Sequence, residues 1–133
     1  MIGPRSGILT LIDTHIALWI YAGEQERLSE AAQAAIEHGD PLLSPIAALE
    51  LTYLHEVDRA RDSLAVMLGA LRKDIGLQLA DASLAELVTA ATDLTWTRDP
   101  FDRLIAAHSI VAGTPLVTAD KAIRENLPHA IWD

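Results

Sequence analysis

The chain has 133 residues, no cysteine and a formal net charge of −9. Its length suits one domain, and without cysteine it can form neither disulfides nor thiolate metal sites. Half of the residues are hydrophobic, yet no apolar run approaches the roughly 18 to 20 residues that a membrane span requires. The acidic charge argues against tight, nonspecific binding to nucleic acid, but not against a site where carboxylates gather divalent cations.

The N-terminal residues make a poor secretory signal. We expect one domain over residues 1–133, with residues 1–7 as a flexible tail, and a cytoplasmic location. The uninterrupted apolar run from Ile8 to Asp13 predicts a strand buried on both faces. A short helical pattern follows and stops at Gly23. The next helix has Ser29 as its N-cap candidate and Gly39 where a C-terminal glycine is expected.

The middle of the chain begins with PLLSP, a short predicted strand in which Ser44 and Pro45 form an N-cap and N1 pair for the following helix. Two helices separated near residues 58–62 come next, and LQLAD predicts a brief third strand. Ser83 is the N-cap candidate of the helix after that strand.

The last third contains a helix that starts around DPFD and ends at Gly113, a buried strand in TPLVTAD, and a short helix in KAIRENLP. AIWD is compatible with a closing strand. Strands that alternate with helices form parallel βαβ units. The sequence therefore predicts an α/β sandwich.

Two aspartates follow predicted strands: Asp13 comes after LTLI, and Asp120 after LVTA. Ligands of such sheets bind at the carboxyl ends of the strands, so we expect both side chains at one rim. Each also suits the N-cap of the next helix, but the strand-end position favours a metal ligand for Asp13. Thr14 and Thr118 can orient these carboxylates through their hydroxyl groups.

Glu50 borders a predicted helical stripe formed by Ile46, Leu49 and Tyr53. The nearest basic residues along the chain are too distant for an i,i+4 ion pair. A charge in apolar surroundings needs a partner, which favours a site. By itself, the residue is equally compatible with a solvated helix-edge glutamate.

The stretch RDPFDRLIAAHS carries two more acids. Asp99 before Pro100 fits an N-cap with proline at N1, and Asp102 then occupies N3, where an acid interacts favourably with the helix dipole. Asp102 can lean toward the strand rim from the first turn. We therefore rank Asp102 above Asp99 as a ligand and treat Asp99 as an accessory residue or cap.

Other chemistries lack their motifs. The five histidines do not have the spacing of HExxH, and the sequence has no GxSxG elbow, P-loop or GxGxxG. The three tryptophans are expected to pack in the core or at an interface. No side-chain nucleophile stands out, so the functional hypothesis rests on the acidic residues.

The stretches LIDTHIALW, SPIAALEL, RDPFDRLIAAHS and LVTAD together resemble the PIN domain, specifically the VapC-type ribonuclease toxins of toxin–antitoxin pairs. Their order and spacing agree over nearly the whole chain. The resemblance implies an acidic quartet around Mg²⁺ or Mn²⁺, formed by Asp13, Glu50, Asp102 and Asp120. It also implies a three-layer α/β/α sandwich with a short, mostly parallel central sheet. An RNA substrate, a homodimer and an antitoxin that covers the site are implied as well.

The chemistry suits these residues, because phosphodiester hydrolysis needs an activated water and stabilised negative charge, and hard oxygen ligands suit Mg²⁺. Two alternatives stay open. One is a PIN-like protein that binds a partner without catalysis. The other is a receiver-like Mg²⁺-binding signalling module, which is disfavoured because LIDTH has one acid rather than a pair and Glu50 lies in a helical pattern.

Overall fold

A five-stranded parallel sheet forms the centre of the molecule, in the order β3-β2-β1-β4-β5. The computed structural model describes residues 7–133, so the predicted tail lies, except for Gly7, outside the described residues. The strands are β1 (Leu9–Ile12), β2 (Asp40–Leu43), β3 (Gln78–Leu79), β4 (Leu116–Val117) and β5 (Ala130–Ile131).

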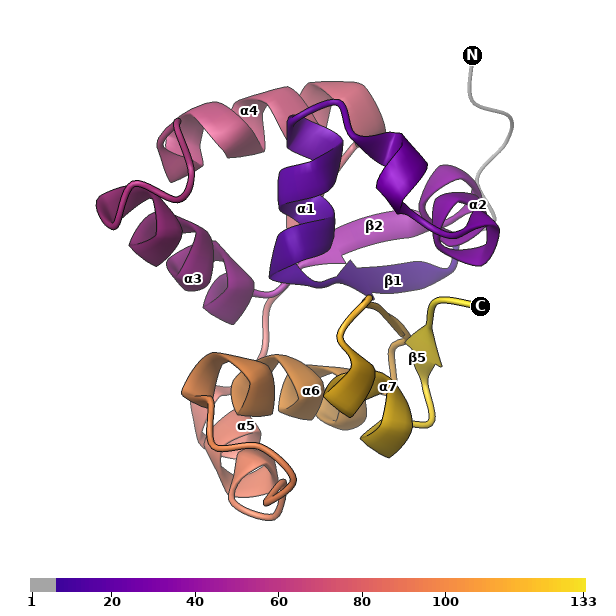
Figure 1. Cartoon of the computed structure of the whole chain (residues 1–133). Coiled ribbons are helices and arrows are strands. Elements are labelled where there is room, and N and C mark those ends of the chain that lie inside the picture. The colour runs from indigo at the N-terminus through magenta and orange to yellow at the C-terminus, as the bar shows by residue number, and fades with distance from the viewer. Residues whose placement is uncertain (1–6) are drawn as a thin grey trace.

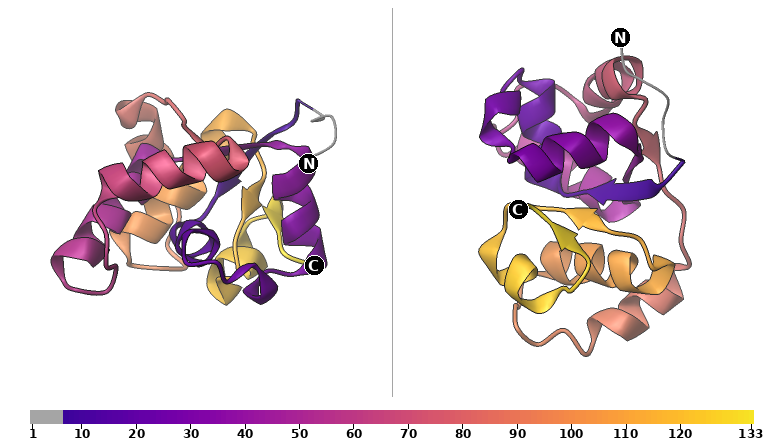
Figure 2. Two further views of the ribbon diagram at one scale, coloured as in Figure 1. Left: turned by 90° about the horizontal axis from the view of Figure 1, so that it is seen from above. Right: turned by 90° about the vertical axis from the view of Figure 1, so that its right-hand side faces the viewer.

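Helices cover both faces of this sheet, which confirms the predicted α/β/α sandwich (Figure 1). On one side lie α1, α2 and α4, and on the other α5, α6 and α7, as the side view in Figure 2 also shows. Helix α3 contacts both α1 and α6. The helices are α1 (Thr14–Tyr21), the 3₁₀ turn η1 (Gln25–Arg27), α2 (Glu30–His38), α3 (Pro45–Glu56), α4 (Leu64–Ile75), α5 (Leu84–Ala91), α6 (Pro100–Ala112) and α7 (Lys121–Asn126).

Strand β1 lies in the middle of the sheet and pairs with β2 on one side and β4 on the other. Ile12 is level with Leu43 of β2 and Val117 of β4. All three side chains are fully buried, as expected of a parallel sheet covered on both faces. The prediction of burial along the whole run is wrong at its start, where the side chains of Ile8 and Leu9 are exposed.

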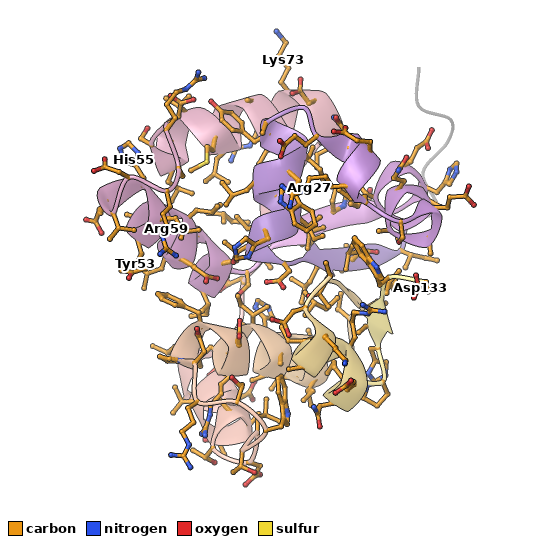
Figure 3. All side chains as sticks on the ribbon, in the orientation of Figure 1. Arg27, Tyr53, His55, Arg59, Lys73 and Asp133 are labelled. Carbon is orange, nitrogen blue, oxygen red and sulfur yellow. The ribbon has the colours of Figure 1, made fainter. Side chains whose placement is uncertain are left out.

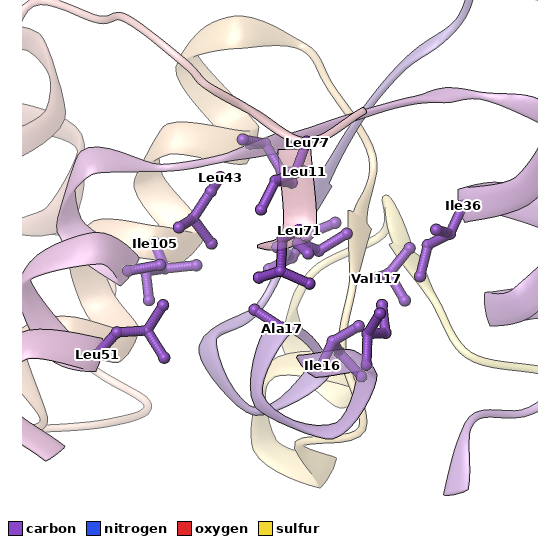
Figure 4. Close-up of a cluster of buried hydrophobic side chains, with 14 of the residues drawn as sticks. Leu11, Ile16, Ala17, Ile36, Leu43, Leu51, Leu71, Leu77, Ile105 and Val117 are labelled. Carbon is purple, nitrogen blue, oxygen red and sulfur yellow. The ribbon is translucent and has the colours of Figure 1, made fainter. Parts of the chain in front are cut away.

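The core is built from the strands and the inner faces of α1, α3, α4 and α6 (Figure 4). In α3 the buried residues are Ala47, Ala48, Leu51 and Leu54. Two members of the predicted helical stripe, Leu49 and Tyr53, face outward, with exposures of 59% and 49%.

The predicted helix starts are confirmed at Ser29, Ser44 and Ser83, whose side chains accept hydrogen bonds from the first turns of α2, α3 and α5. Gly39 ends α2 with an extended backbone rather than a left-handed one. A Cβ there would lie 2.7 Å from the Ala35 carbonyl oxygen and 2.9 Å from that of Ile8. Glycine is therefore needed for close approach to the start of β1.

Two predicted elements are shorter than expected. Helix α5 ends at Ala91 rather than at Leu94, and the closing strand covers only Ala130 and Ile131. Within residues 7–133, none of the helices has the length and apolar character needed to cross a bilayer.

Candidate active site

Asp13 follows the last residue of β1, so its side chain emerges at the carboxyl end of the central strand. Its Oδ1 accepts a hydrogen bond of 2.8 Å from the backbone N–H of Thr14, and its Oδ2 accepts one of 2.7 Å from the hydroxyl of Thr118. Burial raises the pKa of Asp13, while these two hydrogen bonds oppose the rise. Asp13 is therefore the N-cap of α1, and its carboxylate is also fixed at the rim.

The register of the sheet explains why Thr118 reaches Asp13. Ile12 is paired with Val117, so the next residue of each strand stands at the same level. Both side chains are buried, with Thr118 fully so. The Thr118 hydroxyl therefore makes the hydrogen bond to an aspartate that its position in the sequence suggested.

Glu50 lies on α3, one turn beyond the start of that helix, and faces the N-terminus of α1. The hydroxyl of Thr14 donates a 2.5 Å hydrogen bond to Glu50 Oε1. Burial raises the pKa of this half-buried carboxyl, the Thr14 hydrogen bond opposes the rise, and the charge of Asp13 adds to it. The Thr14 hydroxyl thus orients Glu50 and not one of the two strand-end aspartates for which it was expected.

The acids of α6 have different environments. Asp99 is exposed, and its Oδ1 accepts hydrogen bonds from the backbone N–H groups of Phe101 at 2.8 Å and Asp102 at 3.1 Å, which makes it the N-cap. Asp102 is half-buried. Burial, followed by the negative charges of Asp99, Asp13, Asp120 and Glu50, raises the pKa of Asp102 to about 7.

Asp120 follows β4 and is the N-cap of α7, with its Oδ1 accepting a 2.9 Å hydrogen bond from Ile123 N–H. The hydroxyl oxygen of Thr118 accepts a 3.1 Å hydrogen bond from the backbone N–H of Asp120. Thr118 therefore links Asp13 and Asp120 through one side chain.

The five acids form one electrostatic group, because each of the other four contributes a charge that raises the pKa of Asp102. In the part of the chain that the structure describes, no lysine or arginine forms a salt bridge with any of them. His15 is exposed, but its charge lowers the pKa of both Asp13 and Glu50. Its position beside Asp13 in LIDTH is the signal for this closeness.

Of these carboxylates, Asp13 is buried, Glu50 and Asp102 are half-buried, and Asp99 and Asp120 are exposed. Such a group, with no lysine or arginine paired to it in residues 7–133, has the donor chemistry that Mg²⁺ and Mn²⁺ prefer. A divalent ion would offset both the mutual repulsion of these acids and their burial. Over residues 7–133, no three Asp, Glu or His side chains already stand in an arrangement that could hold a metal ion. The carboxylates would therefore need to change rotamer to bind one.

A parallel α/β/α sandwich with acids at the carboxyl ends of its central strands is the architecture expected of a PIN domain. The PIN domain family model matches residues 10–126, and the chain belongs to the PIN domain family. This assignment replaces the receiver-like alternative.

Among relatives, Ribonuclease VapC22 of Mycobacterium tuberculosis is 34% identical over 131 residues, which cover 92% of this chain and 97% of the relative. Solved structures show the same fold at low identity. One is VapBC2 from Rickettsia felis bound to a DNA fragment from its promoter, with a TM-score of 0.64, 19% identity, and coverage of 95% of this chain and 100% of that one. Another is a toxin–antitoxin complex from Klebsiella pneumoniae, with a TM-score of 0.64, 16% identity, and coverage of 92% and 95%.

Proposed function

We propose that this protein is a metal-dependent endoribonuclease, and that it is the toxin of a toxin–antitoxin pair of the VapC type. The observation that carries the proposal is the electrostatic grouping of Asp13, Glu50, Asp102 and Asp120. Asp13 and Asp120 follow β1 and β4, and within residues 7–133 no lysine or arginine forms a salt bridge with any of the four. The 34% identity to Ribonuclease VapC22 supports RNA as the substrate.

The four acids would hold Mg²⁺ or Mn²⁺, which activates a water and stabilises the negative charge that develops on the phosphate. Thr118 fixes the orientation of Asp13, and Thr14 fixes that of Glu50. Both hydroxyls donate to carboxylate oxygens, so each leaves the remaining lone pairs of its acid available for an ion. Asp99, as the cap of α6, holds the first turn that carries Asp102.

The direct test is cleavage of single-stranded RNA by the purified protein in Mg²⁺ and in Mn²⁺, with and without EDTA. Cleavage that EDTA abolishes supports the proposal. Full activity in EDTA contradicts metal dependence, and no cleavage of any RNA in either metal favours the catalytically silent PIN-like binding protein.

The partner proposed here is a small antitoxin, as in the complexes to which the fold is similar. A groove of about 600 Å³ lies between α1 and the α3–α4 connection. Apolar atoms of Leu18 and Met67 line it, and Arg59 adds a positive charge. Its lining also contains Glu24 and Arg61, and Arg61 is paired with Asp62 at 3.2 Å. These features suit an antitoxin segment with apolar and acidic side chains.

Charge reversal tests this groove. Arg59→Glu should reduce copurification of the antitoxin encoded beside this gene, because it replaces a complementary charge with a repulsive one. Lys73→Glu is the matched control, since Lys73 points outward from α4, well away from Arg59 (Figure 3). Equal loss of the antitoxin in both variants would contradict the assignment of the groove.

We also propose a homodimer that works in the cytoplasm, where its RNA substrate is present. Large apolar side chains are exposed on several helices and could be buried between two copies, with specific interfaces usually covering more than ~1,000 Å². They include Val66, Leu84, Val88, Ile110 and Val111. A monomer in light scattering at micromolar concentration would contradict the dimer.

A further inference from the structure

Tyr53 and Phe101 form an aromatic pair that joins α3 to α6. Their ring centroids lie 6.1 Å apart with the planes at 34°, within the range of favourable aromatic contacts. Tyr53 projects from the outer side of α3 (Figure 3). The pair thus connects the two helices that carry Glu50 and Asp102.

The pair lies beside the carboxylate group. Tyr53 is three residues beyond Glu50, and side chains with this spacing are neighbours on one side of a helix. Phe101 directly precedes Asp102, and its backbone N–H donates to Asp99 Oδ1. The aromatic rings therefore border the place where a phosphate would meet the acids.

Tyr53 differs from the other large aromatic side chains in its exposure. The rings of Trp19 and Trp132 contact each other, with centroids 6.5 Å apart, and Trp96 packs against the core. All three are partly buried, whereas 49% of Tyr53 is exposed. Packing the core does not account for an exposed aromatic ring next to the acids, so a ligand is the better explanation.

We infer that Tyr53, supported from behind by Phe101, is a stacking platform for a nucleobase of single-stranded RNA that flanks the phosphate bound at the acidic group. This inference rests on the proposed ribonuclease function and adds to it a residue that positions the substrate. Bases stack on aromatic side chains whatever their sequence, because every base has a π face. Leu49, also exposed on α3, adds apolar surface beside the ring.

The charge of the chain makes such a contact more important. Nucleic-acid binding commonly draws on phosphate contacts by lysine and arginine, whose strength falls steeply with salt. This chain has 10 such residues against 19 acids. Stacking supplies affinity without positive charge, so RNA binding should weaken only modestly as salt is raised.

The test measures RNA binding without hydrolysis, in an Asp13→Asn background with Mg²⁺ present. The probes are a fluorescent oligoadenylate and an abasic ribose-phosphate oligomer of the same length, read by anisotropy. Tyr53→Ala should weaken binding of oligoadenylate about 5- to 100-fold, the usual cost of losing one base–aromatic stack. It should leave binding of the abasic oligomer and the salt dependence unchanged.

Three further variants make the result specific to stacking. Tyr53→Phe should bind like the parent because it keeps a π face, and Tyr53→Leu should lose affinity because it keeps only apolar bulk. Val57→Ala is the matched control, because Val57 is the exposed C-cap residue of α3, one turn farther from Glu50 than Tyr53.

Several outcomes would overturn the inference. These are unchanged oligoadenylate binding in Tyr53→Ala, equal losses for both oligomers, or full affinity in Tyr53→Leu. A change of oligomeric state in Tyr53→Ala would instead assign the pair to an interface between subunits.

If RNA is bound and cleaved by the wild type but Tyr53→Ala has no effect, only the proposal of a stacking platform is wrong. If the wild type neither binds nor cleaves RNA, the proposed function fails as well.

Discussion

Thr118 donates a 2.7 Å hydrogen bond from its hydroxyl to Oδ2 of Asp13, although the two residues are 105 positions apart in the chain. The contact joins the carboxyl ends of β1 and β4, where the parallel register sets the two residues level. Thr118 also accepts a hydrogen bond from the backbone N–H of Asp120. One buried hydroxyl therefore fixes the relative position of two of the proposed metal ligands.

Thr118→Val keeps the shape of the side chain but removes this hydroxyl. Removing a partner of a buried polar group costs about 1–3 kcal/mol, so the melting temperature should fall. Loss of a group that orients a metal ligand typically costs about 10- to 100-fold in activity or metal affinity. Thermal melting and RNA cleavage measure the two effects. Thr118→Ser should retain most of both properties, and equal activity in Thr118→Val and wild type would show that the hydrogen bond is not needed.

Asp13→Asn separates the two roles of Asp13. Asparagine caps a helix about as well as aspartate, so α1 should still form and circular dichroism should be unchanged. The lost negative charge removes a ligand for Mg²⁺, so RNA cleavage should be abolished. Cleavage at the wild-type rate by the folded variant would refute a catalytic role for this residue.

Asp99 and Asp120 both cap helices, but only Asp120 is proposed as a ligand. Metal binding to the native state alone raises stability by roughly 2.7 kcal/mol when the metal is at ~100 times its dissociation constant. Asp120→Asn should lose most of the Mg²⁺-induced rise in melting temperature, whereas Asp99→Asn should keep it. The comparison needs thermal melting of both variants and wild type, with and without Mg²⁺. Identical Mg²⁺ responses in all three would mean that Asp120 is only a helix cap.

The sequence predicted the sandwich because its signals are local. Continuous apolar runs mark the buried parallel strands, and Ser29, Ser44 and Ser83 mark the helix starts. It failed for the exposed side of α3, because helical spacing identifies residues that share a face without saying whether that face is covered. Only the packing of α3 against α1 and α6 shows that Leu49 and Tyr53 point outward.

For the site, strand-end position was sufficient to predict that Asp13 and Asp120 share a rim, because chain direction fixes where parallel strands end. The hydrogen bond between Thr14 and Glu50 could not be predicted from the sequence, because it depends on how α1 and α3 pack against each other. The contact between Tyr53 and Phe101 was missed for the same reason. The sequence places Tyr53 near Glu50 and Phe101 next to Asp102. It does not show that the two rings contact each other across α3 and α6.

The raised pKa values of Asp13, Glu50 and Asp102 predict how the stability of the metal-free protein depends on pH. An acid with a higher pKa in the folded state binds more protons there than in the unfolded chain, so the free energy of unfolding falls as pH rises. For Asp102 the fall begins near the unfolded value of about 4. It is complete once the pH has passed the folded value of about 7.

The metal effect should have the opposite trend. Metal ligands must be deprotonated, so Mg²⁺ has to displace the proton of Asp102 at low pH and binds more tightly as the pH rises. The Mg²⁺-induced rise in melting temperature should therefore be small at about pH 5 and large at about pH 8. Asp102→Asn should flatten the pH dependence of the stability of the metal-free protein and reduce the Mg²⁺-induced rise in melting temperature. Asp93→Asn, which changes an exposed acid outside the group, should alter neither.

Thermal melting across this pH range tests both trends. If the metal-free protein became more stable between about pH 5 and 7, that result would contradict the raised pKa of this carboxylate group.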